Sequence, residues 1–133
     1  MRVLIVEDNE INAVLTRTLL EHAGHSVEVA ADGERALDLL EAAPAGAYDL
    51  VFMDLQLPGM DGFETTQCVR ALPGGRGCVP VVALTANAAA SDEEACLAAG
   101  MDGYLPKPVT FEVLIATLES WRGRSSAKAA PIR

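Results

Sequence analysis

The chain has 133 residues, and half of them are hydrophobic, which is enough to form the buried core of one domain. Its net charge of −9 argues against nucleic acid as a main partner, because contacts with phosphate groups require lysine and arginine. No stretch approaches roughly 18 consecutive apolar residues and the N-terminus lacks the layout of a signal peptide, so we expect a cytoplasmic protein with no membrane segment.

The charge is distributed unevenly along the chain. Residues 1–122 contain 19 acidic and 7 basic residues, whereas residues 123–133 contain three basic residues and no acidic one. We therefore expect one folded domain over residues 1–122, followed by a disordered basic tail over residues 123–133. The three cysteines, Cys68, Cys78 and Cys96, have no metal-ligand spacing, and we expect all of them to be buried free thiols.

Five strand-like runs follow one another along the chain. They are Val3–Val6, Ser26–Ala30, Leu50–Met53, Val79–Leu84 and Gly103–Leu105. Short apolar runs bounded by turn residues indicate strands that are buried on both faces, as in a parallel sheet.

Helical periodicity occupies the segments between and after these strands. For the first helix Asn9 is the expected N-cap, and the spacing of a helical stripe is met by Ile11, Val14, Leu15, Thr18 and Leu19. Further helices are expected at Ala36–Leu40 (ending before Pro44), from Phe63 to Pro73, at Asp92–Ala99 with Gly100 as C-cap, and at Phe111–Leu118. This (βα)5 alternation predicts an α/β fold, a doubly wound parallel sheet of five strands with helices on both faces.

Chemically reactive side chains stand at the ends of four of these strands. Glu7 and Asp8 follow the first strand, Asp54 the third, Thr85 the fourth and Lys107 the fifth. The reactive crevice of an open parallel sheet lies beyond the carboxyl ends of its strands, so we expect these side chains to meet there.

Three carboxylates in one crevice repel each other strongly. Two unit charges about 4 Å apart cost roughly 4 kcal/mol at an effective dielectric constant near 20, and protons or a cation must relieve that repulsion. An oxygen-only cluster suits Mg²⁺. Beside such a cation Asp54 could attack a phosphoryl group, whose oxygens would be contacted by Lys107, the Thr85 hydroxyl and the Ala86 N–H.

Each of these residues also has an ordinary structural explanation. An acidic pair after a strand is often a helix N-terminal feature, an aspartate before a turn often stabilises that turn, and a lysine is usually solvated. What favours a reactive site is the joint placement of all of them at the ends of different strands.

Four segments, Val6–Asn9, Phe52–Gly62, Val82–Ala86 and Tyr104–Pro108, resemble the motifs of the receiver domain of two-component response regulators. The resemblance covers about residues 2–121. It implies a flavodoxin-like fold with strand order 2-1-3-4-5.

The resemblance also assigns roles to the acidic residues. It implies that Asp54 is the phosphoacceptor, that Asp8, Asp54 and the backbone carbonyl of Gln56 bind Mg²⁺, and that Glu7 holds a metal-bound water. Thr85 and Lys107 would contact the phosphoryl group. Tyr104 would be the switch aromatic, although the residues alone favour an ordinary half-buried strand tyrosine.

Three further segments, Asn9–Asn12, Leu84–Ala88 and Cys96–Gly103, are closer to receivers attached to hybrid sensor kinases. The implied function is that of a phosphorelay module that catalyses only its own phosphorylation and dephosphorylation. The implied partners are a histidine kinase or a histidine phosphotransfer protein, with a second copy of the chain as a further candidate. The signal would leave through the face formed by the fourth helix, fifth strand and fifth helix.

Two other functions compete with this interpretation. A Mg²⁺-dependent phosphohydrolase also uses an aspartate nucleophile, but it would want an acidic residue two positions beyond Asp54, where the chain has Gln56, which cannot exchange a proton. A protein-binding module that is never phosphorylated would not need the acidic cluster together with Lys107.

Overall fold

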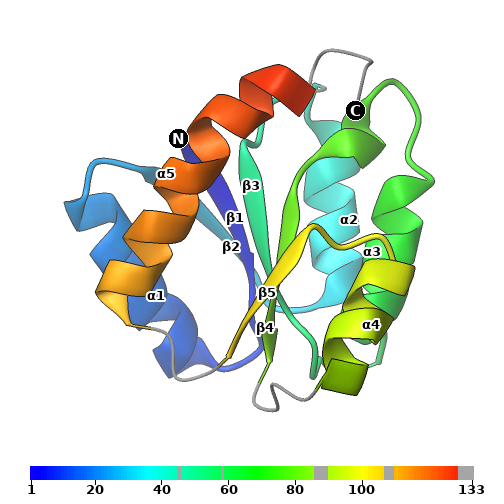
Figure 1. The fold of residues 1–133 in the computed structure, drawn as a ribbon, viewed down its shortest axis with the longest axis horizontal. Coiled ribbons are helices and arrows are strands. Elements are labelled where there is room, and N and C mark those ends of the chain that lie inside the picture. The colour runs from blue at the N-terminus through cyan, green and yellow to red at the C-terminus, as the bar shows by residue number, and fades with distance from the viewer. Residues whose placement is uncertain (45, 58, 86–89, 107–109, 129–133) are drawn as a thin grey trace.

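The computed structural model describes the backbone of residues 1–44, 46–57, 59–85, 90–106 and 110–128; within these, the side chains of 90–93 and 122–128 are not described. It contains five strands, namely β1 (Arg2–Val6), β2 (Ser26–Ala30), β3 (Leu50–Asp54), β4 (Val81–Thr85) and β5 (Gly103–Pro106). The helices are α1 (Glu10–His22), α2 (Gly33–Ala42), α3 (Gly62–Arg70), α4 (Ala90–Ala98) and α5 (Phe111–Lys128), with a 3-10 turn, η1, at Arg76–Cys78. The predicted alternation of strands and helices is confirmed (Figure 1).

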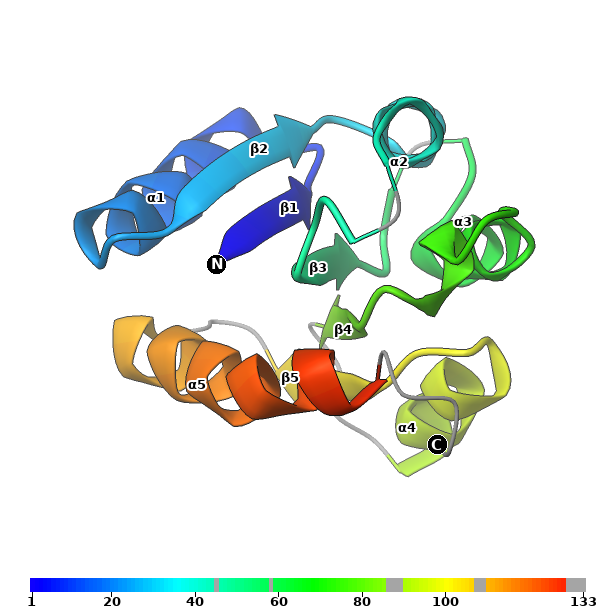
Figure 2. The same cartoon turned by 90° about the horizontal axis from the view of Figure 1, so that it is seen from above.

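All neighbouring strands are parallel, and their order in the sheet is β2-β1-β3-β4-β5, as the resemblance implies. Figure 2 shows α1 and α5 on one face of the sheet and α2, α3 and α4 on the other. Every residue of β3 and β4 is buried, which agrees with central strands covered on both faces. The doubly wound fold is therefore confirmed.

Two hydrophobic cores fill the spaces between the sheet and its two helical layers. Phe52 and Leu114 belong to the core beneath α1 and α5, whereas Met53 and Val69 belong to the core beneath α2 and α3. Successive residues of one strand thus contribute to opposite cores, because successive strand side chains point to opposite faces. No helix in the described part of the chain is long and apolar enough to cross a membrane.

Asparagine and aspartate side chains cap the helices that follow β1, β2 and β3. Asn9 Oδ1 accepts the N–H of Asn12 over 3.0 Å at the start of α1, as predicted, and Asp32 and Asp61 cap α2 and α3 in the same way. Beyond α4, Gly100 takes a φ of +98°, which fits its expected place at the C-terminal end of this helix.

Two sequence expectations differ from the structure. The predicted fourth strand began at Val79, but η1 runs to Cys78 and β4 begins only at Val81. Cys96 is a buried free thiol, as expected, whereas Cys68 and Cys78 are exposed because one lies on the outer side of α3 and the other in η1. The expectation of three buried thiols was therefore wrong for two of them.

The end of α5 bears on the predicted domain boundary. The helix continues to Lys128, so the predicted boundary at residue 122 does not coincide with a helix end, and a disordered tail stays a prediction.

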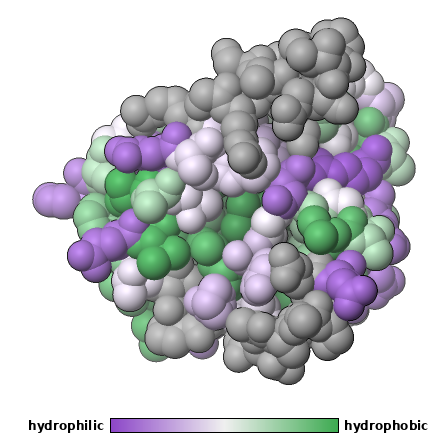
Figure 3. Space-filling model, in the orientation of Figure 1, coloured by the Kyte–Doolittle hydropathy of each residue, from purple (hydrophilic) through white to green (hydrophobic). Residues whose placement is uncertain are grey.

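On the face formed by α4, β5 and α5, hydrophobic patches are visible in Figure 3. Leu97, Phe111 and Val113 are exposed on these two helices.

Candidate functional site

The register of the central strands brings the predicted site residues together. Val6 lies opposite Met53, so the residues that follow them, Glu7 and Asp54, end neighbouring strands at the same edge of the sheet. Asp54 in turn lies opposite Leu84, the residue before Thr85. This edge, at the bottom of Figure 1, carries the carboxyl ends of the strands.

Three carboxylates meet at this edge. Oxygen atoms of Glu7, Asp8 and Asp54 all lie within 4.8 Å of one another. Glu7 and Asp54 are only 5% and 4% exposed, while Asp8 is exposed to solvent. Backbone N–H groups donate to two of the acids: that of Asn9 to Glu7 Oε2 over 3.2 Å and that of Gln56 to Asp54 Oδ1 over 3.0 Å.

The donor chemistry of this cluster fits a hard divalent cation. Three carboxylates offer only oxygen atoms, which Mg²⁺ prefers, and their mutual repulsion would be relieved by a cation. The exposed position of Asp8 leaves one side of the cluster open to solvent. Among the residues that the structure describes, this is the group of acidic, histidine or cysteine side chains that could hold a metal ion.

The other predicted site residues are located to different degrees. Thr85 ends β4 and is 5% exposed, next to the strand that carries Asp54. Tyr104 is half-buried on β5 opposite Ala83, and it packs against the core beneath α2 and α3. Gln56 follows Asp54 in the loop, with an exposed side chain. Lys107 lies outside the described residues, as does Ala86.

The outer surface of α1 differs from the sequence expectation. The helical stripe suggested that Ile11, Val14 and Leu15 face the core, but they are 79%, 60% and 58% exposed. The helix instead buries Ala13 and Leu20. Together with Glu10 and Thr18, the three exposed residues line an open apolar depression on α1. The helix α1 begins two residues after Asp8. We call these five residues the α1 surface.

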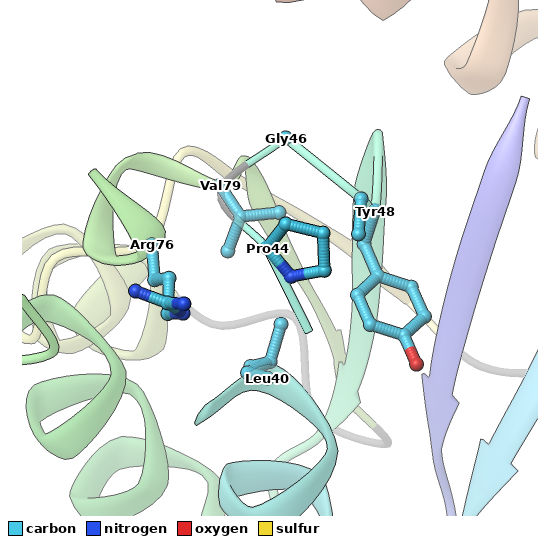
Figure 4. A pocket seen from close by; sticks show the side chains of 7 residues that line it. Leu40, Pro44, Gly46, Tyr48, Arg76 and Val79 are labelled. Atoms are coloured by element: carbon cyan, nitrogen blue, oxygen red, sulfur yellow. The ribbon is translucent and has the colours of Figure 1, made fainter. Parts of the chain in front are cut away.

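A small pocket lies at the opposite end of the sheet, beside the start of β3. Figure 4 shows it between Leu40, Pro44, Tyr48 and Arg76, and its volume is about 10 Å³. This volume accommodates about one water molecule. The pocket is therefore too small for an organic ligand, and it has no acidic residue in its lining.

Two features of the site were missed by sequence reasoning. One is the exposure of the α1 surface beside Asp8. The other is the close approach of Gly62, the first residue of α3, to the main chain of Asp54. The glycine stands within a predicted motif segment, but no local pattern signals which atoms it would touch.

Comparisons with known proteins agree with this fold. The model of the response regulator receiver domain matches residues 3–119. Sensor protein GacS of Pseudomonas syringae pv. syringae is 40% identical over 99% of this chain, but the chain spans only 14% of the length of GacS.

Two solved structures share the fold of this chain over nearly the full length of both chains. The receiver domain of sensor histidine kinase PA1611 from Pseudomonas aeruginosa PAO1, with a magnesium ion coordinated in its active site cleft, is 41% identical with a TM-score of 0.81. The match covers 92% of this chain and 97% of that one. Chemotaxis protein CheY4 of Vibrio cholerae is 32% identical with a TM-score of 0.82, covering 90% and 96%. The predicted likeness to receivers of sensor kinases is confirmed, and the chain belongs to the response regulator receiver domain family.

Proposed function

We propose that the chain accepts a phosphoryl group on Asp54 from a phosphohistidine of a kinase or phosphotransfer protein. The observation that carries this proposal is the convergence of Glu7, Asp8 and Asp54, whose carboxylate oxygens lie within 4.8 Å at the carboxyl ends of β1 and β3. In the transfer step, an Asp54 oxygen forms a bond to phosphorus while the bond from phosphorus to the donor imidazole nitrogen breaks. The imidazole leaves with the electron pair of that bond and takes up a proton.

The acidic cluster supports a role for Mg²⁺ in this step. Asp8, Asp54 and the backbone carbonyl of Gln56 are the proposed ligands, and Glu7 is proposed to act through a metal-bound water. When bound, Mg²⁺ would neutralise the charge on the phosphoryl oxygens. The chain's own contribution is positioning: the Gln56 N–H donates to Asp54 Oδ1 over 3.0 Å and so helps to fix the orientation of this carboxylate.

Thr85 and Lys107 are the proposed partners of the transferred phosphoryl oxygens. The position of Thr85 at the buried end of β4, beside Asp54, supports its part of the proposal. A phosphoryl oxygen would give the Thr85 hydroxyl a charged acceptor, worth about 1.5–3 kcal/mol. Such a bias shifts a two-state equilibrium by one to two powers of ten.

We propose that this bias changes the face formed by α4, β5 and α5. Tyr104 is half-buried on β5 and would move inward when Thr85 shifts toward the phosphoryl group. The exposed Leu97, Phe111 and Val113 give this face apolar surface for a partner, including a second copy of the chain. The histidine-bearing donor is proposed to bind elsewhere, on the α1 surface beside Asp8.

Labelling with acetyl phosphate and Mg²⁺ tests the central step. Intact-mass measurement should show one added phosphoryl group, which hydroxylamine removes and which Asp54→Ala abolishes, while Asp49→Ala leaves labelling unchanged because Asp49 lies at the opposite end of β3. Undiminished labelling of the Asp54 variant would refute the assignment. Steady turnover of generic phosphoesters would instead favour the phosphohydrolase alternative, against which the amide side chain of Gln56 argues.

A further inference from the structure

We propose that Gly62 is a positioning residue for the acidic site. Its lack of a side chain lets the first turn of α3 lie directly against the main chain at the end of β3. That main chain carries the Asp54 carboxylate and leads directly to the Gln56 carbonyl. The inference rests on the proposed function, because it assigns Gly62 the task of holding those two oxygen donors in place.

The space around Gly62 is closed by backbone atoms. A Cβ atom at this position would lie 2.5 Å from the Asp54 carbonyl oxygen and 2.9 Å from the Leu55 Cα. Carbon atoms in favourable contact are about 3.5–4.0 Å apart, so even a methyl group would displace the end of β3 or the start of α3. Gly62 does not have a positive φ. A glycine is therefore needed here for the close backbone contact and not for an unusual backbone conformation.

Hydrogen bonds connect the first residue of α3 to the residues around Asp54. The Gly62 N–H donates to the Leu55 carbonyl over 3.1 Å, and the Leu55 N–H donates to the Leu84 carbonyl over 3.2 Å. The Gln56 N–H donates to Asp54 Oδ1. A displacement at Gly62 would therefore reach both the carboxylate of Asp54 and the residue that offers its carbonyl.

The chain contains one matched control for this effect. Gly77 repeats the backbone contact, because a Cβ there would lie 2.7 Å from the Arg70 carbonyl oxygen. Arg70 ends α3, so that contact is at the far end of the helix from Asp54.

Two cations distinguish positioning from a general loss of structure. Mg²⁺ demands nearly ideal octahedral ligands, whereas Ca²⁺ accepts longer and less regular contacts. A small displacement of oxygen donors should therefore weaken Mg²⁺ binding more than Ca²⁺ binding. For Gly62→Ala we expect the Mg²⁺ dissociation constant to rise about tenfold or more, as for other residues that orient metal ligands, and the Ca²⁺ constant to rise clearly less.

The experiment is calorimetric titration of the wild-type chain, Gly62→Ala and Gly77→Ala with Mg²⁺ and with Ca²⁺, alongside urea unfolding of each. Both variants are expected to unfold at lower urea concentration, but only Gly62→Ala should change the ratio of the two metal affinities. An unchanged ratio in Gly62→Ala, or an equal change in Gly77→Ala, would overturn the inference.

A second variant covers the case in which Gly62→Ala does not fold. One glycine inserted between Gly59 and Met60 lengthens the loop without placing a side chain against Asp54. The insertion should disturb the hydrogen bond between the Gly62 N–H and the Leu55 carbonyl, and it should lower the ratio of Mg²⁺ affinity to Ca²⁺ affinity. An unchanged ratio refutes the positioning role. A wild-type chain that neither binds Mg²⁺ nor accepts a phosphoryl group would refute the proposed function and, with it, this inference. Normal wild-type behaviour with unaffected variants would refute the inference alone.

Discussion

Arg70 and Asp102 form an ion pair, with 2.8 Å between Nη2 and Oδ2, and the same carboxylate oxygen accepts the Val81 N–H over 2.9 Å. The other two nitrogens of this guanidinium donate to three backbone carbonyls: Nε to that of Gly100, and Nη1 to those of Gly77 and Val79. One side chain at the end of α3 thus binds the segments that lead into β4 and β5. It does so at the end of the sheet opposite Asp54.

Replacing Arg70 by alanine should lower the free energy of unfolding by about 3 kcal/mol, because the partly buried Asp102 and several carbonyls lose a charged donor. Arg17→Ala is the control, since Arg17 pairs with Glu21 on the exposed side of α1 and should cost about 0.5 kcal/mol or less. Urea unfolding measures both. Equal effects of the two substitutions would show that the Arg70 network contributes little.

Because of Tyr48, the free energy of unfolding should depend on pH in the alkaline range. Burial and the hydrogen bond that its hydroxyl donates to Glu28 raise the pKa of Tyr48 above its ordinary value of 10.0. The folded chain therefore keeps this proton to higher pH than the unfolded chain, so the stabilisation is complete below about pH 10 and is lost as pH rises through the folded pKa.

The Tyr48→Phe variant tests this dependence. It should be less stable than the wild-type chain near neutral pH by about 1 kcal/mol, the typical worth of one hydrogen bond. The deficit should shrink as the pH rises above about 10, because the wild-type chain then loses this contribution. Thermal unfolding at several pH values measures the difference, and a deficit that stays constant as the pH is raised would contradict the assigned pKa shift.

The convergence of the acidic residues could be predicted because parallel strands fix it. Glu7 and Asp54 each follow or end an apolar run, and the carboxyl ends of neighbouring parallel strands lie at one edge of the sheet. Only the neighbouring position of β1 and β3 was needed in addition, and it came from the family resemblance. The sequence therefore predicted the location of the site from local patterns and one rule of topology.

Features that depend on packing between distant segments could not be predicted in this way. In α1, Ala13 and Leu20 form one apolar stripe and Ile11, Val14 and Leu15 another, so periodicity alone could not choose which side meets the sheet. The Arg70 network joins residues far apart in the sequence, with no local signal. Gly62 lacks a positive φ, so only the tertiary contact with the main chain of Asp54 explains why a glycine is needed at this position.

Asp8 and Glu7 should contribute differently to Mg²⁺ binding. Asp8→Asn is expected to weaken Mg²⁺ binding more than Glu7→Gln, because Asp8 is a proposed direct ligand while Glu7 is proposed to act through water. Without metal, Asp8→Asn should also raise the free energy of unfolding by about 1 kcal/mol, since it removes one of three like charges within 4.8 Å. Calorimetric titration and urea unfolding measure the two effects. Equal losses of affinity would contradict the division of roles.

The α1 surface should matter for transfer from a protein donor and not for a small one. Leu15 is 58% exposed on this surface, and burying a leucine against a partner is worth about 1.5–3 kcal/mol. Leu15→Asp is therefore expected to slow transfer from a phosphorylated histidine phosphotransfer protein, one that labels the wild-type chain, by about tenfold or more. Acetyl phosphate makes no use of this surface, so labelling by it should stay unchanged.

Leu97→Asp is the matched control for that experiment. Leu97 is 57% exposed, nearly the same as Leu15, but it lies on α4, on the other face of the sheet. The same change of charge and size there should leave transfer from the protein donor unchanged. Rapid-quench measurement of transfer rates, with acetyl phosphate labelling in parallel, separates the possibilities. A loss with both donors would mean that Leu15→Asp damages the acidic site itself, and equal slowing by both variants would mean that the donor does not bind specifically to α1.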